Sequence, residues 1–548
     1  MVPLAVSLLQ LAVAMPPQDA HLLRDVKGAQ GRFETIRRSH LPREWSSRPE
    51  RCDAHIGRFC YWYDSTETKP VPESRVITDA RNRFIAFLDS AVAKNPGVAW
   101  LSGQRVRYLI EAGRLDEAIA DARSCSAEAW WCAALGGLAL HVAMQYAAAD
   151  SAFALALATV PEAQRCSWFD LSSSLPLSVA RAFRKASCSE RVVFAQRLWT
   201  LSKPLWQTPG NDLRTEHFAR LTMAAIYTRT ANAYGISWGD DSREMMIRYG
   251  WSEWFTRDES SAFAMPIVTP NITGHDREPS YSFYPKLRSL RIEPLVATSW
   301  NLREPVATSR YSPRHIERLE SLPHQLTRFP RGDSMLVVAV VAPRDTALHS
   351  DSVRSLLGSL RDTTLRSTGE SGTTLRLIVP ADTSVIDVES YGVRSHHAAR
   401  ARYSLDPLSR MGGWSLSDVL LYRASPAGPT RELDSALTTA IGEPVDRSAP
   451  LGVLWELERP GPASPMTVAV TVAPVKVSLF RKLAGTLHLA EAVTPVKIQW
   501  TASGLPGRAV ESVVLRLRPD SRGRYRVTLS VSDDAGRHLS SSRDIDVK

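Results

Sequence analysis

The chain has 548 residues, which is too long for one hydrophobic core and predicts about three or four domains. Its hydrophobic content of 44% and its charged content of 23% are ordinary for globular protein. The formal net charge of +10 comes mostly from scattered arginines. A nucleic-acid-binding protein would show a basic stripe interleaved with aromatic residues, so we expect no nucleic-acid partner.

The first segment of the chain, residues 1–14, resembles a secretory leader. An apolar run, Val2–Ala14, ends in Ala12-Val13-Ala14 and is followed by Pro16-Pro17, as in a signal peptide and its cleavage site. The run lacks basic residues before it, which leaves open a start upstream of Met1. A buried N-terminal helix is the alternative, although the two prolines would end it. No later stretch of about 20 apolar residues follows, so we expect an extracytoplasmic protein without a transmembrane helix.

The cysteines support export. The chain has six of them, namely Cys52, Cys60, Cys125, Cys132, Cys166 and Cys188. They include no CxxC pair and no zinc-type spacing with histidine, so we expect no metal site and no cofactor. The nearest-neighbour pairing, Cys52–Cys60, Cys125–Cys132 and Cys166–Cys188, is the simplest connectivity. The alternative is a set of buried free thiols in a cytosolic protein, which the even count and the leader-like segment disfavour.

The first half of the chain has helical periodicity after an irregular start. Residues 15–75 are rich in arginine, proline and serine, and we expect an irregular lead-in there. Residues 76–208 are predicted to be helical. Within them, Gly113–Ala118 forms a turn into a helix, and Tyr146–Ala149 repeats its last part 31 residues later. These small and bulky positions resemble the tetratricopeptide repeat, which implies close-packed helix pairs and a protein-binding surface.

The central segment, residues 209–330, begins with a predicted helix. Asn211 and Asp212 are good N-cap residues after Pro209-Gly210, and apolar residues then recur at helical spacing. We expect this helix to end near Gly235. Met245, Ile247 and Tyr249 alternate with other residues, which predicts a short half-buried strand after the turn.

Trp238, the Asp240-Asp241 pair and Ile247-x-Tyr249-Gly250 resemble the signature of the GWxTD-domain proteins. The upstream Asn211-x-x-x-x-Glu216-His217-Phe218-x-Arg220 fits the helix of that family. The family is bacterial and extracytoplasmic and has no established activity, so the resemblance implies location rather than chemistry. The motif departs from the pattern at several positions: Ser237 and Asp240 replace Gly and Thr, and Ser242-Arg243 replaces Arg-Gly.

Two interpretations of this motif compete. In the functional one, Trp238, Asp240, Asp241, Arg243 and Tyr249 form a binding pocket. In the structural one, the tryptophan packs on the helix, an aspartate caps a turn, and Arg243 pairs with an acid. We favour the structural interpretation and predict no catalytic residue, because no histidine, cysteine or serine is arranged as nucleophile and base.

In the second half of the chain, the apolar residues recur at every second position, which is the period of a β-strand. Residues 259–329 are expected to be a long loop, and 424–449 a linker or loop. Residues 331–448 and 449–548 are predicted to form two β-sandwich-like units, or one larger one. The clearest pattern is Tyr525, Val527, Leu529 and Val531 alternating with polar residues, typical of a sheet buried on one face. The fold class is therefore multidomain: a helical first half, a mixed α/β centre and an all-β second half.

The sequence contains no P-loop, GxGxxG, HExxH or EF-hand motif. Our first hypothesis is a non-enzymatic interaction or scaffold protein of the bacterial cell envelope with a protein partner. The second is a hydrolase using carboxylates near Asp240 and Asp241. The third is a protein that binds carbohydrate or an envelope polymer through exposed aromatics. The sequence predicts neither the partner nor the oligomeric state.

Overall fold

The structure is a computed structural model of the chain. It describes residues 17–44, 52–62, 70–258, 272–277, 280–284, 308–342, 345, 347–348, 351–361, 364–370, 373–383, 385–426, 428–442, 445–461, 464–475, 495–504, 506–517 and 522–548. The predicted leader, residues 1–14, lies outside these ranges. The chain divides into two compact units. The first is Met1–Pro204, Thr208–Tyr284 and Asn301–His315, and the second is Leu205–Gln207, Pro285–Trp300 and Ile316–Lys548.

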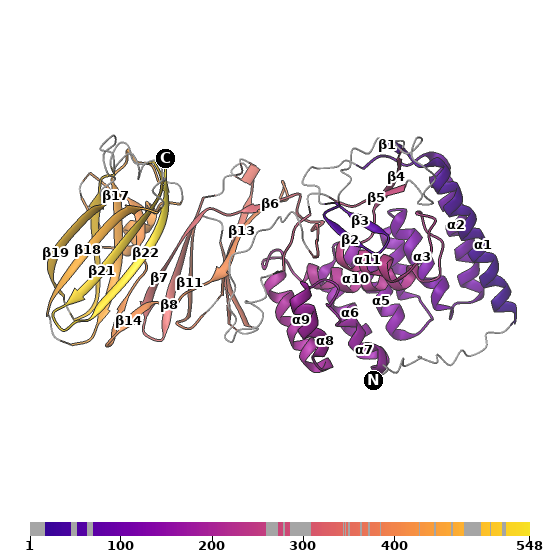
Figure 1. The fold of residues 1–548 in the computed structure, drawn as a ribbon, viewed down its shortest axis with the longest axis horizontal. Coiled ribbons are helices and arrows are strands. Elements are labelled where there is room, and N and C mark those ends of the chain that lie inside the picture. Colours follow the sequence, from indigo (N-terminus) through magenta and orange to yellow (C-terminus); the bar gives the residue numbers. More distant parts are fainter. Residues whose placement is uncertain are drawn as a thin grey trace. The chain divides into compact units, whose positions relative to one another are not determined.

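The predicted change from helices in the first half to strands in the second is confirmed (Figure 1). The helices of the first unit are α1 (Pro17–His40), α2 (Arg75–Lys94), α3 (Ala99–Glu111), α4 (Leu115–Arg123), α5 (Ala129–Val142), α6 (Tyr146–Thr159), α7 (Glu162–Trp168), α8 (Leu177–Lys185), α9 (Cys188–Ser202), α10 (Asp212–Tyr227) and α11 (Asp240–Tyr249). Its strands are β1 (Arg43–Glu44), β2 (Ala54–Ile56), β3 (Phe59–Tyr61), β4 (Trp254–Asp258) and β5 (Ile272–His275).

The expectation of an irregular lead-in over residues 15–75 is wrong for its first part. Helix α1 is 24 residues long and packs along α2 (Figure 1). Phe33 of α1 is buried, with ring centroids 5.9 Å from Phe84 and 5.4 Å from Tyr108. Packing of this kind stabilises a helix whose local sequence gives only a weak signal, which is why composition alone misjudged it.

Helices α5 and α6 approach each other closely, as the predicted small residues require. A Cβ on Gly137 of α5 would lie 2.7 Å from the ring of Phe153 on α6, a distance that real side chains do not adopt. Both Phe153 and the nearby Ala149 are fully buried. Glycine therefore permits the crossing, and any larger residue at position 137 would separate the two helices.

The predicted nearest-neighbour disulfides are confirmed. Cys52–Cys60 closes the hairpin of β2 and β3, Cys125–Cys132 joins the end of α4 to α5, and Cys166–Cys188 joins α7 to α9. No free cysteine remains, since these pairs account for all six. Three disulfides in one unit indicate that the chain folds in an oxidising environment.

The strand predicted over Met245, Ile247 and Tyr249 is wrong, because these residues belong to helix α11. Its buried positions include Ser242, Met246 and Tyr249, which follow the helical period rather than alternation. Two aspartates in the first turn favour the positive end of the helix dipole. A five-residue apolar pattern fits both the helical and the strand period. The two aspartates that precede it were therefore the better indication of a helix.

Helix α10 begins as predicted but ends earlier. Asn211 is its N-cap, and the side-chain oxygen accepts a hydrogen bond from the backbone of Arg214 at 3.0 Å. The helix ends at Tyr227 rather than near Gly235. Gly235 has a φ of +70° and lies in the turn that follows.

The second unit is built from open sheets. Its strands are β6 (Arg318–Ser321), β7 (His324–Arg331), β8 (Ser334–Val341), β9 (Val353–Arg361), β10 (Thr364–Glu370), β11 (Thr374–Pro380), β12 (Val385–Gly392), β13 (His397–Ser404), β14 (Ser409–Met411), β15 (Trp414–Leu416), β16 (Leu420–Arg423), β17 (Leu451–Arg459), β18 (Ser464–Pro474), β19 (Val496–Gly504), β20 (Gly507–Leu515), β21 (Gly523–Asp533) and β22 (His538–Val547). The sheet orders are β10-β9-β12-β13-β6, β11-β8-β7, β14-β15-β17-β16 with β20 also on β17, and β19-β18-β21-β22. All neighbours are antiparallel except β13 and β6.

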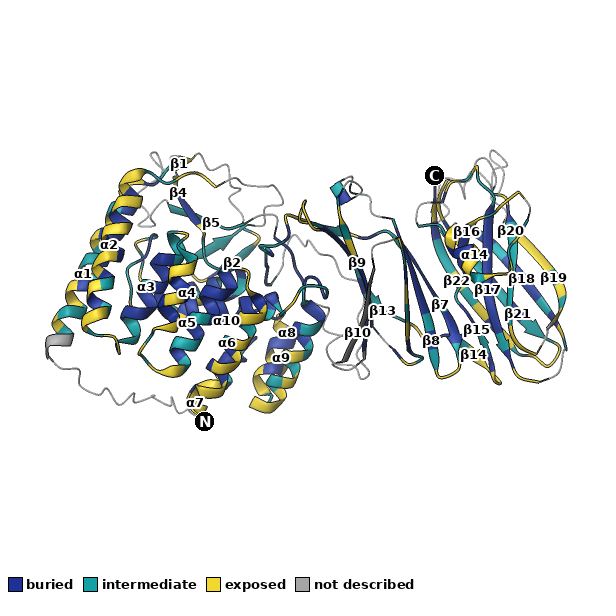
Figure 2. Cartoon of the chain, turned by 180° about the vertical axis from the view of Figure 1, so that it is seen from behind, coloured by how far each residue is buried: buried dark blue, intermediate teal, exposed yellow. Residues whose placement is uncertain are grey.

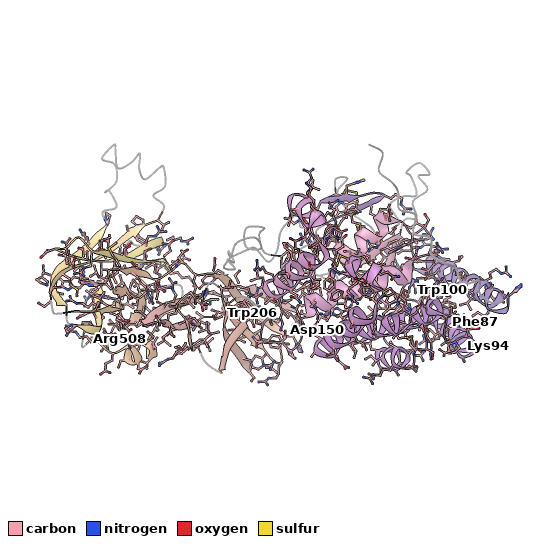
Figure 3. All side chains as sticks on the ribbon, turned by 90° about the horizontal axis from the view of Figure 1, so that it is seen from below. Phe87, Lys94, Trp100, Asp150, Trp206 and Arg508 are labelled. Atoms are coloured by element: carbon pink, nitrogen blue, oxygen red, sulfur yellow. A yellow bond between two sulfur atoms is a disulfide. The ribbon has the colours of Figure 1, made fainter. Side chains whose placement is uncertain are left out.

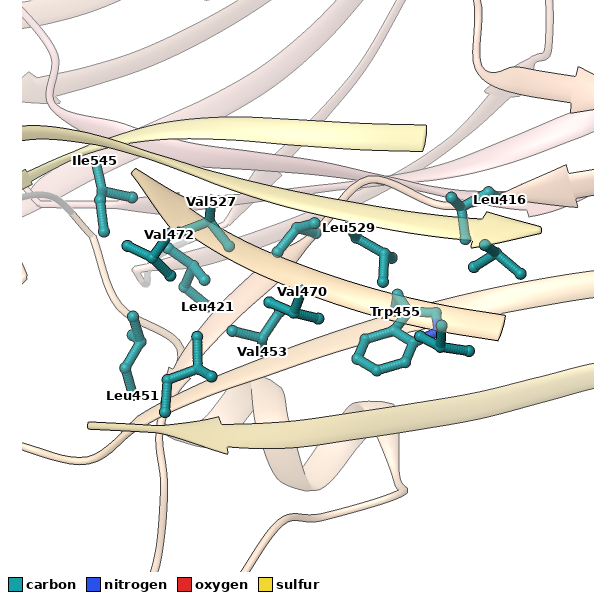
Figure 4. Packing of buried hydrophobic residues seen from close by; sticks show 14 of the residues in the cluster. Leu416, Leu421, Leu451, Val453, Trp455, Val470, Val472, Val527, Leu529 and Ile545 are labelled. Carbon is teal, nitrogen blue, oxygen red and sulfur yellow. The ribbon is translucent and has the colours of Figure 1, made fainter. Parts of the chain in front are cut away.

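Three apolar layers hold these sheets together. One contains Val337 and Leu375 with Leu357 and Val388, and so joins the β11-β8-β7 sheet to the β9-β12 sheet. A second uses the other face of β8, where Val338 and Val340 lie with side chains of β16 and β17. The third is the largest and joins β15, β16 and β17 to β18, β21 and β22 (Figure 4). The alternating residues of β21 point into it as predicted.

Strand β12 is buried along its whole length, although it contains two carboxylates. Arg402 Nη2 lies 2.6 Å from Asp387 Oδ2, and the backbone of Trp206 (labelled in Figure 3) donates to Glu389 at 2.5 Å. Burial and the neighbouring Asp387 raise the pKa of Glu389. The second unit therefore pairs Asp387 Oδ2 and Glu389 internally, whereas Asp387 Oδ1 is buried with no hydrogen-bond partner among the described residues.

Two predicted loops contain regular structure. Residues 424–449 include a short helix, α14 (Leu433–Thr438), and the segment 259–329 includes β5, β6 and most of β7. Residues 259–271 of that segment lie outside the described residues. Among the helices that the structure describes, none combines the length and the apolar content that crossing a membrane requires.

Candidate functional site

The central motif is built around helix α10, which is buried on nearly every side. Its start is fixed by Asp150 of α6 (labelled in Figure 3), which accepts a hydrogen bond from the backbone of Asn211 at 2.7 Å and pairs with Arg214. Gly210 precedes it with a φ of +72°, and a Cβ there would lie 2.5 Å from the backbone of Ala147. Only glycine allows this entry into the helix.

A buried charge network runs along α10. Glu216 Oε2 lies 2.6 Å from His141 Nε2, and Glu216 Oε1 lies 2.5 Å from Arg220 Nε. The other ring nitrogen of His141 lies 2.8 Å from Thr215 Oγ1. Burial disfavours the charge on Glu216, but Arg220 and His141 outweigh it and hold the pKa of this carboxyl well below its usual range. Glu216 is therefore a fixed carboxylate inside the unit.

Arg220 connects this network to the end of α11. Its Nη1 donates to the carbonyls of Ile247 at 3.2 Å and Arg248 at 2.8 Å, and its Nη2 donates to the carbonyl of Arg310 at 2.7 Å. The last carbonyls of a helix have no partner within the helix, so Arg220 satisfies two of them. Gly250 follows with a φ of +92°, and a Cβ there would lie 3.4 Å from Arg220. Glu216, Arg220 and Tyr249-Gly250, which carry the resemblance to the GWxTD-domain proteins, therefore lie close together in the structure.

The predicted site residue Asp241 is held by the disulfide-closed hairpin. Arg58 Nε lies 2.6 Å from Asp241 Oδ2, Arg58 Nη2 lies 2.8 Å from Asp241 Oδ1, and the backbone of Arg58 also donates to Oδ2. The hydrogen bonds from Arg58 lower the pKa of Asp241 strongly. Gly57 lies directly on this contact, because a Cβ there would be 2.4 Å from the Asp241 Cβ.

The other predicted site residues do not converge on Asp241. Tyr249 stacks on Tyr61 of the same hairpin, with ring centroids 3.7 Å apart and planes 5° apart. Trp238 packs on Tyr227 at the end of α10, with ring centroids 5.0 Å apart. Asp240 and Arg243 are exposed on α11. The predicted pairing of Arg243 with an acid is not found among the described residues. Tyr249 and Trp238 therefore make separate packing contacts, and the predicted residues do not form one pocket.

A small cavity lies beside the charge network. Its volume is about 40 Å³, enough for a water molecule rather than a substrate. Of the predicted site residues, Tyr249 lines it. The other lining residues are Glu216, Arg220, Gly250, Trp251, Glu253, Asp276, Arg277, Ser280, Arg310, Tyr311, Ser312 and Arg314. Much of this charge is paired internally, as in Arg314 with Glu253 at 2.6 Å.

A second buried acid lies at the start of α10. Asp212 is fully buried, and its Oδ2 is 3.9 Å from His315 Nδ1. Burial raises the pKa of Asp212 to about 6, against the opposing effects of Lys203 and His141. Sequence reasoning treated this residue only as a helix cap. The groups that interact with Asp212 include His141 and His315, which come from segments distant in sequence, so no local pattern could have identified it.

No group of three or more metal-ligating side chains occurs in the part of the chain that the structure describes. An open groove does occur on α1. A groove of about 790 Å³ lies between α1 and the turn after α10, and its lining residues are Gly28, Gly31, Arg32, Thr35, Ile36, Arg38, Ala231, Asn232, Gly235 and Ile236. Sequence analysis missed this groove because it predicted no helix over residues 17–40.

Comparison with known proteins gives little. No family model matches the chain, and no curated protein matches it. Red sea bream transglutaminase is similar at a TM-score of 0.14 and 10% identity, over 41% of this chain and 31% of that one. Two structures of Bacteroides uniformis β-glucuronidase, one of them β-glucuronidase 2, give TM-scores of 0.15 and 0.16 at 8% identity, over 39% of this chain and 26% of theirs. The chain spans less than a third of these proteins, and likenesses at this level carry no argument.

Proposed function

We propose that the protein is an exported, non-enzymatic interaction or scaffold protein of the bacterial cell envelope. The observation that carries the proposal is the pairing of Asp241 with Arg58 on the hairpin that Cys52–Cys60 closes. A carboxylate fixed in a two-point ion pair with a lowered pKa is a poor general acid or base. The central motif then acts as a structural corner that joins α10, α11 and the hairpin.

The disulfides support a location outside the cytoplasm. Reducing thiol systems of the bacterial cytoplasm keep most cysteines free, whereas all six here are paired. The leader-like residues 1–14 and the resemblance to GWxTD-domain proteins point to the same compartment. The close-packed helix pairs of α3 to α6 support the tetratricopeptide-like interpretation, and such repeats commonly bind proteins.

We assign the protein partner to the groove on α1. Two glycines, Gly28 and Gly31, leave the helix surface without side chains, so a partner segment can approach the backbone. A Cβ on Gly31 would meet nothing within 4 Å, so the groove there is open. Ile36 and Ile236 add apolar surface and Arg32 adds an exposed cation. This combination suits an extended or helical peptide segment of a protein.

The test is to fill the groove without disturbing the fold. Gly31→Arg places a long side chain in the open space and favours helix formation. Ala86→Arg, at an exposed position on α2, adds the same side chain outside the groove and serves as the control. Tagged protein recovered from the native cell envelope should lose its co-purifying protein roughly tenfold in the Gly31 variant only. Equal recovery in both variants would contradict the groove assignment.

The two alternatives have less support. A hydrolase at Asp240 and Asp241 would need an accessible cleft, yet neither residue lines the cavity beside Arg220 or the α1 groove. A polymer-binding protein would need a row of exposed aromatics. Within the described part of the second unit, the exposed large hydrophobic side chains are Ile378, Val393, Met411 and Ile498, none of them aromatic.

A further inference from the structure

Helices α8 and α9 lie side by side in the first unit, and both carry exposed residues (Figure 2). Between Leu177 and Ser202 the chain has five cations and a single carboxylate, Glu190. The cations are Arg181, Arg184, Lys185, Arg191 and Arg197. The pair is fixed in place by the Cys166–Cys188 disulfide and by packing of Phe183 on Phe194, with centroids 5.3 Å apart.

The single carboxylate does not neutralise this charge. Glu190 accepts hydrogen bonds from the backbone and the hydroxyl of Ser187, both at 2.7 Å, as the capping box of α9. Arg191 is also committed, because it donates to the carbonyls of Ala186 at 3.1 Å and Arg184 at 2.6 Å. Arg181, Arg184 and Lys185 are exposed, and no carboxylate among the described residues forms an ion pair with them.

Three of these cations share one face of α8 with an exposed leucine. Leu177, Arg181, Arg184 and Lys185 are spaced i, i+4, i+7 and i+8, and all four are exposed. The opposite face, with Val179, Ala180 and Phe183, is buried in the unit. The leucine is 63% exposed, and Val193 of α9 is 60% exposed. Exposed apolar side chains on the same helix face as exposed cations are typical of a helix that lies in a membrane interface.

We propose that the α8–α9 pair docks on the surface of an anionic phospholipid membrane. Arg181, Arg184 and Lys185 contact lipid phosphates, and Leu177 enters the boundary between headgroups and acyl chains. Helix α8 has nine residues and is about 14 Å long, so it lies on the bilayer and does not cross it. The proposal goes beyond the scaffold function, because it uses another surface than the α1 groove and needs no protein partner.

The test is co-sedimentation of the full chain, disulfides intact, with phosphatidylcholine vesicles that contain or lack phosphatidylglycerol. We expect binding only to the anionic vesicles and loss of binding between about 0.05 M and about 0.5 M salt. Each cation near such a surface strengthens binding about fivefold, so Arg181→Ser/Lys185→Ser should weaken it about 25-fold. Leu177→Ser should weaken it roughly tenfold, and this loss should persist at low salt.

The matched control is Arg83→Ser/Lys94→Ser, which removes two exposed cations from α2 and lowers the net charge by the same amount. It should bind like the unmodified protein. Circular dichroism and a thiol assay establish that each variant is folded and oxidised. Absence of binding to anionic vesicles would overturn the proposal, and so would equal losses in the α2 and α8 variants. Because the groove variant Gly31→Arg should still bind vesicles, failure here is separable from failure of the scaffold function.

Discussion

Arg58 and Asp241 are 183 positions apart in the sequence and form a two-point ion pair, with Nε–Oδ2 at 2.6 Å and Nη2–Oδ1 at 2.8 Å. The arginine belongs to a hairpin closed by Cys52–Cys60 and the aspartate to the first turn of α11. Tyr61 and Tyr249 stack between the same two elements. The pair is partly exposed and contributes little energy alone, so its role is to fix where the hairpin lies on the helix.

The first prediction concerns Gly57, which precedes Arg58 in the chain and lies against the side chain of Asp241. Gly57→Ala adds a Cβ 2.4 Å from the Asp241 Cβ, at a φ of +52°. The hairpin must move, and we expect the free energy of unfolding of the first unit to fall by about 2 kcal/mol. Amide hydrogen exchange in the first turn of α11 should accelerate.

The control for Gly57 is Gly113, which has a φ of +71° and no atom within 4 Å of its Cβ position. Gly113→Ala carries the backbone strain without the clash, so it should cost about 1 kcal/mol and leave exchange in α11 unchanged. If both variants accelerate exchange in α11 equally, the hairpin does not depend on close contact with Asp241.

The second prediction concerns Arg220, whose guanidinium contacts Glu216 and three backbone carbonyls. Lysine cannot reproduce this fork, so Arg220→Lys should lower the free energy of unfolding of the first unit by about 3 kcal/mol. Arg214→Lys is the control on the same helix, since its ion pair with Asp150 is partly exposed, and it should cost about 1 kcal/mol or less. Urea unfolding that shifts equally in the two variants would refute the capping role of Arg220.

The third prediction compares two disulfides by loop length. Cys166–Cys188 closes a separation of 22 residues and Cys125–Cys132 one of 7. In the chain-entropy account, removal of the longer loop by serine substitution should cost about 3 kcal/mol, and removal of the shorter about 2 kcal/mol. Denaturant midpoints in the reverse order would show that native packing, rather than chain entropy, dominates at these sites.

The sequence identified features that depend on short-range patterns. The disulfide pairs, the Asn211 cap and the alternating strand β21 were recoverable because spacing, capping chemistry and alternation are local. Helix α1 was missed because its stability depends on packing against α2, which composition does not reveal. The segment 245–249 was assigned the wrong period because five residues are too few to separate helix from strand.

The contacts of the predicted site residues did not follow from the sequence. Trp238, Asp241 and Tyr249 were predicted either as binding residues or as parts of a structural corner, and in the structure each contacts a different element. Their partners, Tyr227, Arg58 and Tyr61, come from α10 and from a hairpin that lies far away in the sequence. Contacts between distant segments follow from tertiary packing, and one sequence without an alignment does not encode them in any local pattern.

The last prediction concerns the pH dependence contributed by Asp212. Burial raises the folded-state pKa of this carboxyl to about 6, whereas an unfolded aspartate titrates near about 4. Between these values the folded state binds more protons than the unfolded state, so this residue makes stability fall as pH rises from about 4 to about 6. Asp212→Asn removes that loss. The variant should gain about 2 kcal/mol relative to the unmodified protein on going from pH 4 to pH 7. Urea unfolding at both pH values measures the gain, and parallel profiles of the two proteins would show that Asp212 is charged at low cost inside the unit.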